Sequence, residues 1–207
     1  WKATARTLKL MVKDFSSASG AGVLAVDLRC AGLHTCDNLL SALLSIAIAY
    51  YLEASPAYIY ELDRGERLSL DPEGVLRYAI SRALEPSIAS RLELYEYIQP
   101  ATLEELRALA RIPLRSKVTP ATEGGALTAI SPLVVGGREL LDIVSKHRGR
   151  GVEVYVVIPR SPWLDALDVE EAYSIYQTVR NIVARLEGLG AVVYSCCPPR
   201  RVTSRSL

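Results

Sequence analysis

A length of 207 residues and a mass of 22.6 kDa suit a single domain with a substantial hydrophobic core. Half of the residues are hydrophobic and 23% are charged, which is a globular composition. The formal net charge of +1 provides no broad field for attracting nucleic acid or anionic membranes, so a polyanion-binding function is not expected.

Arginine supplies 19 of the 24 basic residues, and the chain has only one methionine, two asparagines and two glutamines. This scarcity of thermolabile residues suggests a thermophilic source. It also bears on the four cysteines, because intracellular proteins of hyperthermophiles can keep disulfides. Free thiols and a Cys30–Cys36 bridge therefore both stay open, since spacing alone does not prove pairing.

Apolar, β-branched runs bounded by turn residues predict the strands, which we expect over 8–12, 22–28, 57–62, 66–70, 127–135, 152–158 and 191–195. Helical periodicity predicts most of the segments between them: 37–53, 72–84, 102–111, 137–147 and a last helix after residue 168. Alternating strands and helices favour an α/β fold with a mostly parallel sheet, Rossmann-like, covered by helices on both faces.

The last predicted helix has clear end signals, and the helix over 37–53 has an unusually apolar composition. The last one has Asp168 as its N-cap, Glu171 as the reciprocal partner in a capping box, and Gly188 and Gly190 at its end. The helix over 37–53 is apolar nearly all round, but its run from 39 to 52 is too short to span a membrane and is interrupted by serines. We expect it to be a buried helix.

The domain organisation follows from these elements. We expect residues 1–21 to form an N-terminal strand or arm, residues 22–198 the α/β domain, and residues 199–207 a flexible basic tail. Three prolines and a TPATEGGA turn predict an irregular insertion near 87–123. The N-terminus shows no secretory signal pattern, so a cytoplasmic location is expected.

Ligands of open parallel sheets bind beyond the carboxyl ends of the strands, near the point where strand order reverses. In this sequence that place is the segment VDLRCAGLHTCDN, in which Asp27 closes the first parallel strand. One interpretation of Asp27 is a metal or phosphate site. The other is a carboxylate that accepts hydrogen bonds from loop amides or pairs with Arg29.

The opening segment WKATARTLKLMVKDF, followed by an apolar strand that ends in aspartate, resembles the family called domain of unknown function fifty-eight. Its members contain a von Willebrand factor type A-like domain and are typically encoded beside MoxR-type AAA+ ATPases. The positions that fit the family pattern are Trp1, Lys2, Ala5, Arg6, Leu10, Val12 and Phe15. In this family the tryptophan motif lies in the interior, so the resemblance implies that this chain is the C-terminal part of a longer protein. Any membrane contact would be made by parts outside this chain, which would then be the cytoplasmic portion of an anchored protein.

The resemblance also implies where a metal would bind. Metal-binding type A domains carry DxSxS after the first strand and an Asp from a later loop, which suit Mg²⁺ or Mn²⁺. Here Asp27, Arg29 and Ala31 occupy the first three positions, and Gly136 and Gly137 stand where the later Asp is expected. An inward-pointing Arg29 would replace the cation, so we expect a degenerate site without a cofactor.

Other groups of side chains in the sequence suggest alternative sites. Thr35 or Asp37 could substitute for the missing serines and preserve a metal site. Zinc binding by Cys30, His34 and Cys36 lacks a fourth ligand, because Cys196 and Cys197 are expected at a distant sheet edge. His147 lies at a helix end, where favourable interaction with the helix dipole explains it. No nucleophile motif or phosphate-binding loop is present.

These observations predict a non-enzymatic adaptor whose surface around Asp27, Arg29, His34 and Asp37 binds a protein partner. The family resemblance implies that the partner is a MoxR-type AAA+ ATPase. The alternative is a Rossmann-like metal-dependent hydrolase that uses Asp27 with Glu61 and Asp63. That reaction requires the three carboxylates to converge on a shared metal.

Overall fold

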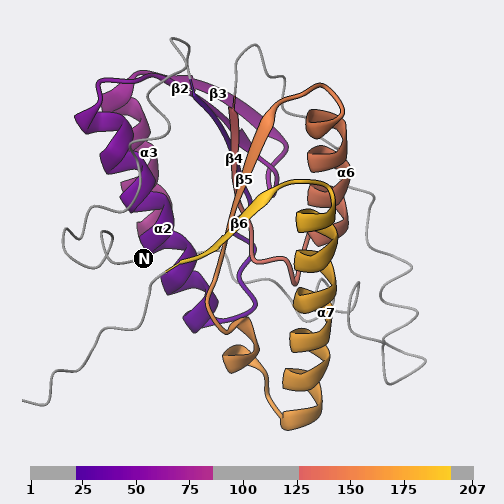
Figure 1. Cartoon of the computed structure of the whole chain (residues 1–207). Coiled ribbons are helices and arrows are strands. Elements are labelled where there is room, and N and C mark those ends of the chain that lie inside the picture. Colours follow the sequence, from indigo (N-terminus) through magenta and orange to yellow (C-terminus); the bar gives the residue numbers. More distant parts are fainter. Residues whose placement is uncertain (1–21, 86–125, 197–207) are drawn as a thin grey trace, which may run out of the picture.

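A computed structural model describes residues 22–85 and 126–196, which form a three-layer α/β arrangement. In Figure 1 the sheet is the middle layer, with α2 and α3 on one side of it and α6 and α7 on the other side. The elements, in chain order, are β1 (Gly22–Val26), α2 (Leu33–Leu52), β2 (Ala57–Glu61), β3 (Glu66–Leu70), α3 (Pro72–Leu84), β4 (Ala126–Ile130), α6 (Gly137–Arg148), β5 (Glu153–Ile158), the 3-10 helix η2 (Pro162–Asp165), α7 (Val169–Gly188) and β6 (Val192–Ser195).

The sheet has six strands in the order β3-β2-β1-β4-β5-β6, and the prediction of a mostly parallel sheet is confirmed. All neighbouring pairs are parallel except β2 and β3, which are antiparallel and joined by a tight turn. Gly65 adopts a φ of 72° in that turn, and its amide donates to the Glu61 carbonyl at 2.8 Å. Glycine tolerates this left-handed conformation without the steric cost of a Cβ atom.

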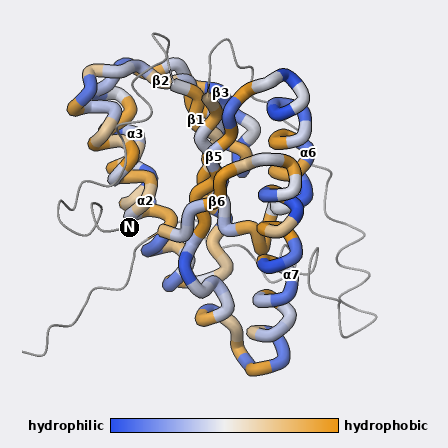
Figure 2. The backbone as a smooth tube through the Cα atoms, in the orientation of Figure 1, coloured by the Kyte–Doolittle hydropathy of each residue, from blue (hydrophilic) through white to orange (hydrophobic). Residues whose placement is uncertain are grey.

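The core lies on both faces of the sheet. Side chains of alternate residues in β1 point to opposite faces, so Val23 and Ala25 join the cluster under α6 and α7, while Leu24 and Val26 join the cluster under α2 and α3. Figure 2 shows mostly hydrophobic strands, whereas α6 and α7 alternate between hydrophobic and hydrophilic residues. Because burial of a leucine-sized side chain contributes about 1.5–3 kcal/mol, these two clusters are the main source of stability.

The helix α2 differs from its prediction. It begins at Leu33, four residues earlier than predicted, and only its inner face is covered by the described residues. Leu39, Leu43 and Ala47 are fully buried, but Leu52 is 76% exposed and Ile48 is 47% exposed. Its length and apolar composition would suffice to cross a membrane, yet here its inner face packs against the sheet and α3.

The predicted caps of α7 are partly confirmed. Asp168 accepts a hydrogen bond from the Glu171 amide at 2.8 Å, as an N-cap does. The Glu171 carboxylate reaches back to the amide of Leu167 at 2.8 Å, not to Asp168 as a capping box requires. The helix ends at Gly188, and Gly190 has a φ of 85° in the following turn.

Strand β4 is shorter than the predicted 127–135. It ends at Ile130 because Pro132 has no amide hydrogen and Leu133 has a φ of 60°. The predicted strand over 8–12, the arm 1–21, the helix over 102–111, the insertion near 87–123 and the tail 199–207 lie outside the described residues.

Candidate functional site

The loops after β1, β4 and β5 meet at the carboxyl edge of the sheet, where β1 and β4 lie side by side. The chain leaves β1 towards β2 and leaves β4 towards β5, so strand order reverses between them, the usual position of a site in this architecture. Asp27 follows β1 directly, and its amide donates to the Ile130 carbonyl at 2.9 Å. This bond fixes the carboxylate at the reversal point.

Asp27 and Arg29 form a buried, two-pronged ion pair. Arg29 Nε donates to Asp27 Oδ1 at 2.8 Å and Nη2 donates to Oδ2 at 2.6 Å, while the Arg29 amide also donates to Oδ1 at 3.1 Å. The two residues are 1% and 7% exposed. The interpretation of Asp27 as an ion-pairing and amide-binding residue is confirmed, and three strong donors already occupy its two oxygens.

The electrostatics of this pair combine two opposing effects. Burial raises the pKa of the Asp27 carboxyl above its ordinary value of 3.8, and the charge of Asp63 acts in the same direction. The hydrogen bonds and positive charge of Arg29 lower that pKa and so oppose the rise. Arg29 therefore supplies the positive charge that compensates the buried carboxylate.

Gly136, which the sequence places where an Asp would be expected, has a steric role. Its φ is 76°, and a Cβ atom at this position would collide with Arg29 Nη2 and Asp27 Oδ2. The loop after β4 thus brings its bare backbone against the ion pair. Glu139, in the first turn of α6, extends the network because its carboxylate lies 3.7 Å from Arg29 Nη2.

A second buried charge cluster lies at the carboxyl end of β2. Arg82 of α3 donates through Nη2 to Asp63 at 2.6 Å, and its Nε lies 3.3 Å from Glu61 Oε1 without hydrogen-bond alignment. Tyr78, one helical turn earlier, donates to Glu61 at 2.8 Å. Burial and the neighbouring Glu61 carboxylate raise the pKa of Tyr78, so the phenol remains a donor.

Sequence reasoning did not identify Arg82 or Tyr78. The available signal was their spacing of four residues, which places them on one helix face. Nothing in the local sequence shows that this face meets Glu61 and Asp63, because the contact depends on how α3 packs on the sheet.

The carboxylates that a hydrolase would need are engaged in these two ion-pair networks. Asp27 is paired with Arg29, and Glu61 and Asp63 are paired with Arg82. Within residues 22–85 and 126–196, no group of three or more His, Cys, Asp and Glu side chains is arranged to hold a metal ion. The described residues therefore offer no carboxylate cluster for the hydrolase alternative.

The proposed replacement ligands lie in the first turns of α2. Thr35 and Asp37 belong to α2, where Asp37 is exposed and Thr35 is fully buried. The Thr35 hydroxyl has no hydrogen-bond partner in the described part of the chain, but its amide donates to Asp165 of η2 at 2.7 Å. His34 donates to the same carboxylate at 2.9 Å through its amide. Asp165 therefore caps α2, whose own N-cap residue provides no side-chain cap.

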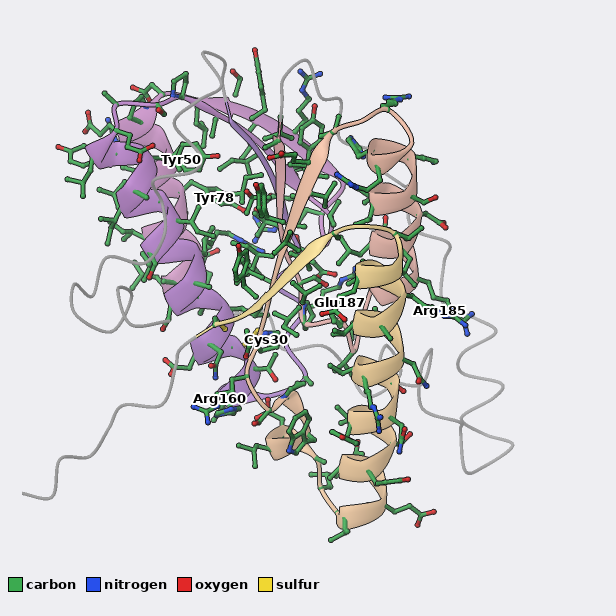
Figure 3. All side chains as sticks on the ribbon, viewed as in Figure 1. Cys30, Tyr50, Tyr78, Arg160, Arg185 and Glu187 are labelled. Atoms are coloured by element: carbon green, nitrogen blue, oxygen red, sulfur yellow. A yellow bond between two sulfur atoms is a disulfide. The ribbon has the colours of Figure 1, made fainter. Side chains whose placement is uncertain are left out.

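The cysteines Cys30 and Cys36 form a disulfide that ties the loop after β1 to the first turns of α2. Both thiols are thus unavailable as zinc ligands. Cys196 follows β6 at the end of the sheet, as predicted, but this end is not distant from α2, because the Cys196 sulfur is 3.8 Å from Asn38 Oδ1. Parallel strands all end at one edge, and the twist of the sheet brings the end of β6 towards α2. Figure 3 shows Cys30 and Arg160 near the start of α2.

His147 lies in the last turn of α6, as the sequence predicts, but its side chain is buried. His147 is 0% exposed, and its Nδ1 makes a hydrogen bond of 2.8 Å with the Ile143 carbonyl. The ring is therefore held by a hydrogen bond within its own helix and is shielded from solvent.

The surface at the carboxyl edge differs from the predicted partner surface. Asp27 and Arg29 are buried beneath it, His34 is half-buried and holds the Arg160 carbonyl at 2.9 Å through Nε2, and only Asp37 is exposed. Exposed apolar side chains that sequence reasoning did not single out complete this edge: Leu33, Leu164 and Leu167. Comparison of the sequence with protein-family models and with curated proteins finds no match.

Proposed function

We propose that this chain is a von Willebrand factor type A-like domain of the family it resembles and that it acts as a non-enzymatic interaction module. The strand order β3-β2-β1-β4-β5-β6, with β3 alone antiparallel, supports this assignment. So does an aspartate directly after β1, at the reversal point of the sheet.

The observation that carries the proposal is the Arg29 guanidinium on Asp27. Both carboxylate oxygens accept from it, at 2.8 and 2.6 Å, so a metal ion would have to displace a paired guanidinium. In this proposal the guanidinium replaces the cation of a metal-dependent adhesion site. Binding then depends on the shape and side chains of the carboxyl edge and not on a shared metal.

The partner in this proposal is a MoxR-type AAA+ ATPase, and the domain couples its ATP-driven remodelling to a client. The domain would work in the cytoplasm, where the Cys30–Cys36 disulfide fits a hyperthermophilic source. The exposed Asp37 and the apolar Leu33 and Leu164 beside it are the contact residues that we assign to this role.

The first test measures binding of the full chain to a MoxR-type ATPase from the same genome, with and without nucleotide. Leu164→Glu and Asp37→Arg should each weaken binding, because they alter exposed side chains at the carboxyl edge. Arg185→Glu is the matched control, since Arg185 is exposed on the outer side of α7. No association in any nucleotide state would refute the adaptor role.

The second test is calorimetric titration of Mg²⁺ and Mn²⁺ into the protein. We expect no stoichiometric binding, because Arg29 already neutralises Asp27. Asp27→Asn, which keeps the side-chain shape, is the control. Stoichiometric heat in the native protein that disappears in this variant would show that a metal displaces Arg29, and the proposal of a built-in cation would fail.

A further inference from the structure

Within residues 22–85 and 126–196, the strand β6 forms one end of the sheet, and its own sequence lacks the features that normally protect a free edge. Its sequence, VVYS, contains no charge or proline, and Val192 and Tyr194 are 45% and 43% exposed. The strand at the other end, β3, carries exposed Glu66 and Arg67, which are typical protective residues. Figure 1 shows β6 nearest the viewer, in front of β5.

The backbone of β6 presents hydrogen-bonding groups to this free side. The Cys196 amide donates inward, to the Ile158 carbonyl at 2.9 Å. Because the direction of strand amides alternates, the amide and carbonyl groups of Val193 and Ser195 point away from β5. They are positioned to pair with another strand.

An apolar groove runs along α7, the helix that contacts β6 on this face of the sheet. It has a volume of about 310 Å³, and its lining includes Trp163, Tyr176, Val183, Arg180 and Glu187. Trp163 and Tyr176 of this lining pack edge to face with ring centres 5.2 Å apart. Ile182, on the side of α7 that does not line the groove, contacts Gly137 of α6. The groove is therefore on the side of α7 away from α6. Figure 3 shows Glu187 on the side nearer β6 and Arg185 on the other side.

The opposite face of the same edge is also apolar. Tyr194 stacks on Tyr155 with ring centres 6.4 Å apart, and Val192 pairs in register with Tyr155. A strand added to β6 would thus bury apolar side chains on both faces of the sheet.

We propose that the occupant of this edge is a second copy of the chain, paired β6 to β6 in antiparallel orientation across a two-fold axis. Neighbouring strands are about 4.8 Å apart, so a helix above the gap between β5 and β6 lies about 4.8 Å from the two-fold axis. The α7 helices of the two copies would then be about 10 Å apart. That is the distance at which helices pack. The two sheets become one continuous sheet, and the two α7 helices lie antiparallel on the same face.

Charge complementarity favours a second copy over an unrelated strand. Arg180 and Glu187 are exposed and lie seven residues apart on the groove side of α7. In an antiparallel helix pair centred between Val183 and Ala184, Arg180 of each copy faces Glu187 of the other. A two-fold axis therefore creates two ion pairs from a single helix, and uncharged β6 adds no repulsion.

The experiment is sedimentation equilibrium of the full chain over a wide concentration range. We expect a dimer, and Arg180→Glu or Glu187→Arg alone should raise its dissociation constant on the order of tenfold by creating like-charge contacts. The double variant Arg180→Glu/Glu187→Arg should restore association. Arg185→Glu, which changes the net charge as Arg180→Glu does, should leave it unchanged.

A second variant tests the strand itself. Tyr194→Lys places a charge on an exposed edge position without touching the core, so it should yield a folded monomer by circular dichroism. A native protein that stays monomeric at every concentration would overturn the proposal and indicate that another segment or partner covers β6. A dimer that tolerates both Tyr194→Lys and Arg180→Glu would place the interface elsewhere. Neither result depends on ATPase binding, so the proposed adaptor role is tested separately.

Discussion

At the scale of single residues, the Asp27–Arg29 pair is stable only while both partners are present. Arg29→Ala would leave a carboxylate that is 1% exposed without its cation, and loss of one partner of a buried pair costs about 3–5 kcal/mol. The loss of stability in Arg29→Ala should be smaller at low pH. Arg29 lowers the pKa of Asp27, so removal of Arg29 raises that pKa further above 3.8. Asp27 then takes up a proton in the folded variant as the pH falls, which removes the unpaired charge.

Urea unfolding of the native protein and of Arg29→Ala, at pH 7 and at pH 4–5, measures how this loss of stability depends on pH. Arg77→Ala is the control, because the Arg77–Glu73 pair is exposed and such pairs contribute about 0.3–0.5 kcal/mol. An Arg29→Ala penalty as small as that of Arg77→Ala, or one that grows as the pH falls, would contradict the buried ion pair.

Gly136 leads to a second prediction at this scale. Gly136→Ala should destabilise the protein by more than 1–2 kcal/mol, because a φ of 76° is costly for alanine and the new methyl group meets Arg29 and Asp27. Gly188→Ala should be neutral or slightly stabilising, since open space surrounds Gly188 at the end of α7. Thermal unfolding of the two variants checks the contrast, and equal effects would argue against close packing at Gly136.

The sequence allows the first of the two charge clusters to be predicted but not the second. Asp27 and Arg29 are two residues apart, so their pairing was a local inference. Arg82 is nineteen residues from Asp63, and their contact exists only after β3 has turned back and α3 has packed on the sheet. Long-range ion pairs of this kind follow from tertiary packing, which residue spacing does not encode.

At the scale of elements, the disulfide joins the loop after β1 to α2. A bridge between residues six apart in sequence stabilises by about 2 kcal/mol in the loop-entropy account. Reduction, or the double variant Cys30→Ala/Cys36→Ala, should therefore lower the free energy of unfolding by that amount. Urea unfolding with and without a dithiol reductant measures the effect, and reductant should not change the double variant. An unchanged midpoint for the native protein would indicate that the bridge is absent in solution.

Element boundaries were predicted well where their signals are local. Helix α3 begins after Asp71, whose side chain accepts from the Gly74 amide at 2.9 Å, and the prediction of 72–84 is confirmed. Helix α2 begins four residues before its predicted start, because its cap, Asp165, comes from η2. A cap supplied by a distant element leaves no mark next to the helix that it caps.

At the scale of the whole molecule, burial predicts an order of local stability. Four of the five residues in β1 and in β4 are buried, whereas none of the residues in β3 or β6 is buried. Amide hydrogen exchange should therefore be slowest in β1 and β4 and much faster in β3 and β6. Mass spectrometry of peptides that cover these strands checks the order, and faster exchange in β1 than in β3 would contradict it.

The layered α/β architecture was predictable because strands and helices alternate along the chain. The surface was not. Leu164 and Leu167 appear in the sequence as ordinary apolar residues, and their exposure of 63% and 75% follows from the path of the chain around η2.

The bond between Asp165 and the start of α2 joins residues 131 apart, and this has a consequence for synthesis of the protein on the ribosome. Strand β1 and α2 leave the ribosome early, but β1 still lacks its neighbour β4, and α2 still lacks its cap. Until residue 165 has emerged, the nascent chain exposes an apolar strand edge and a helix with unsatisfied amides. This interval is when chaperone capture or misassociation competes most strongly with folding.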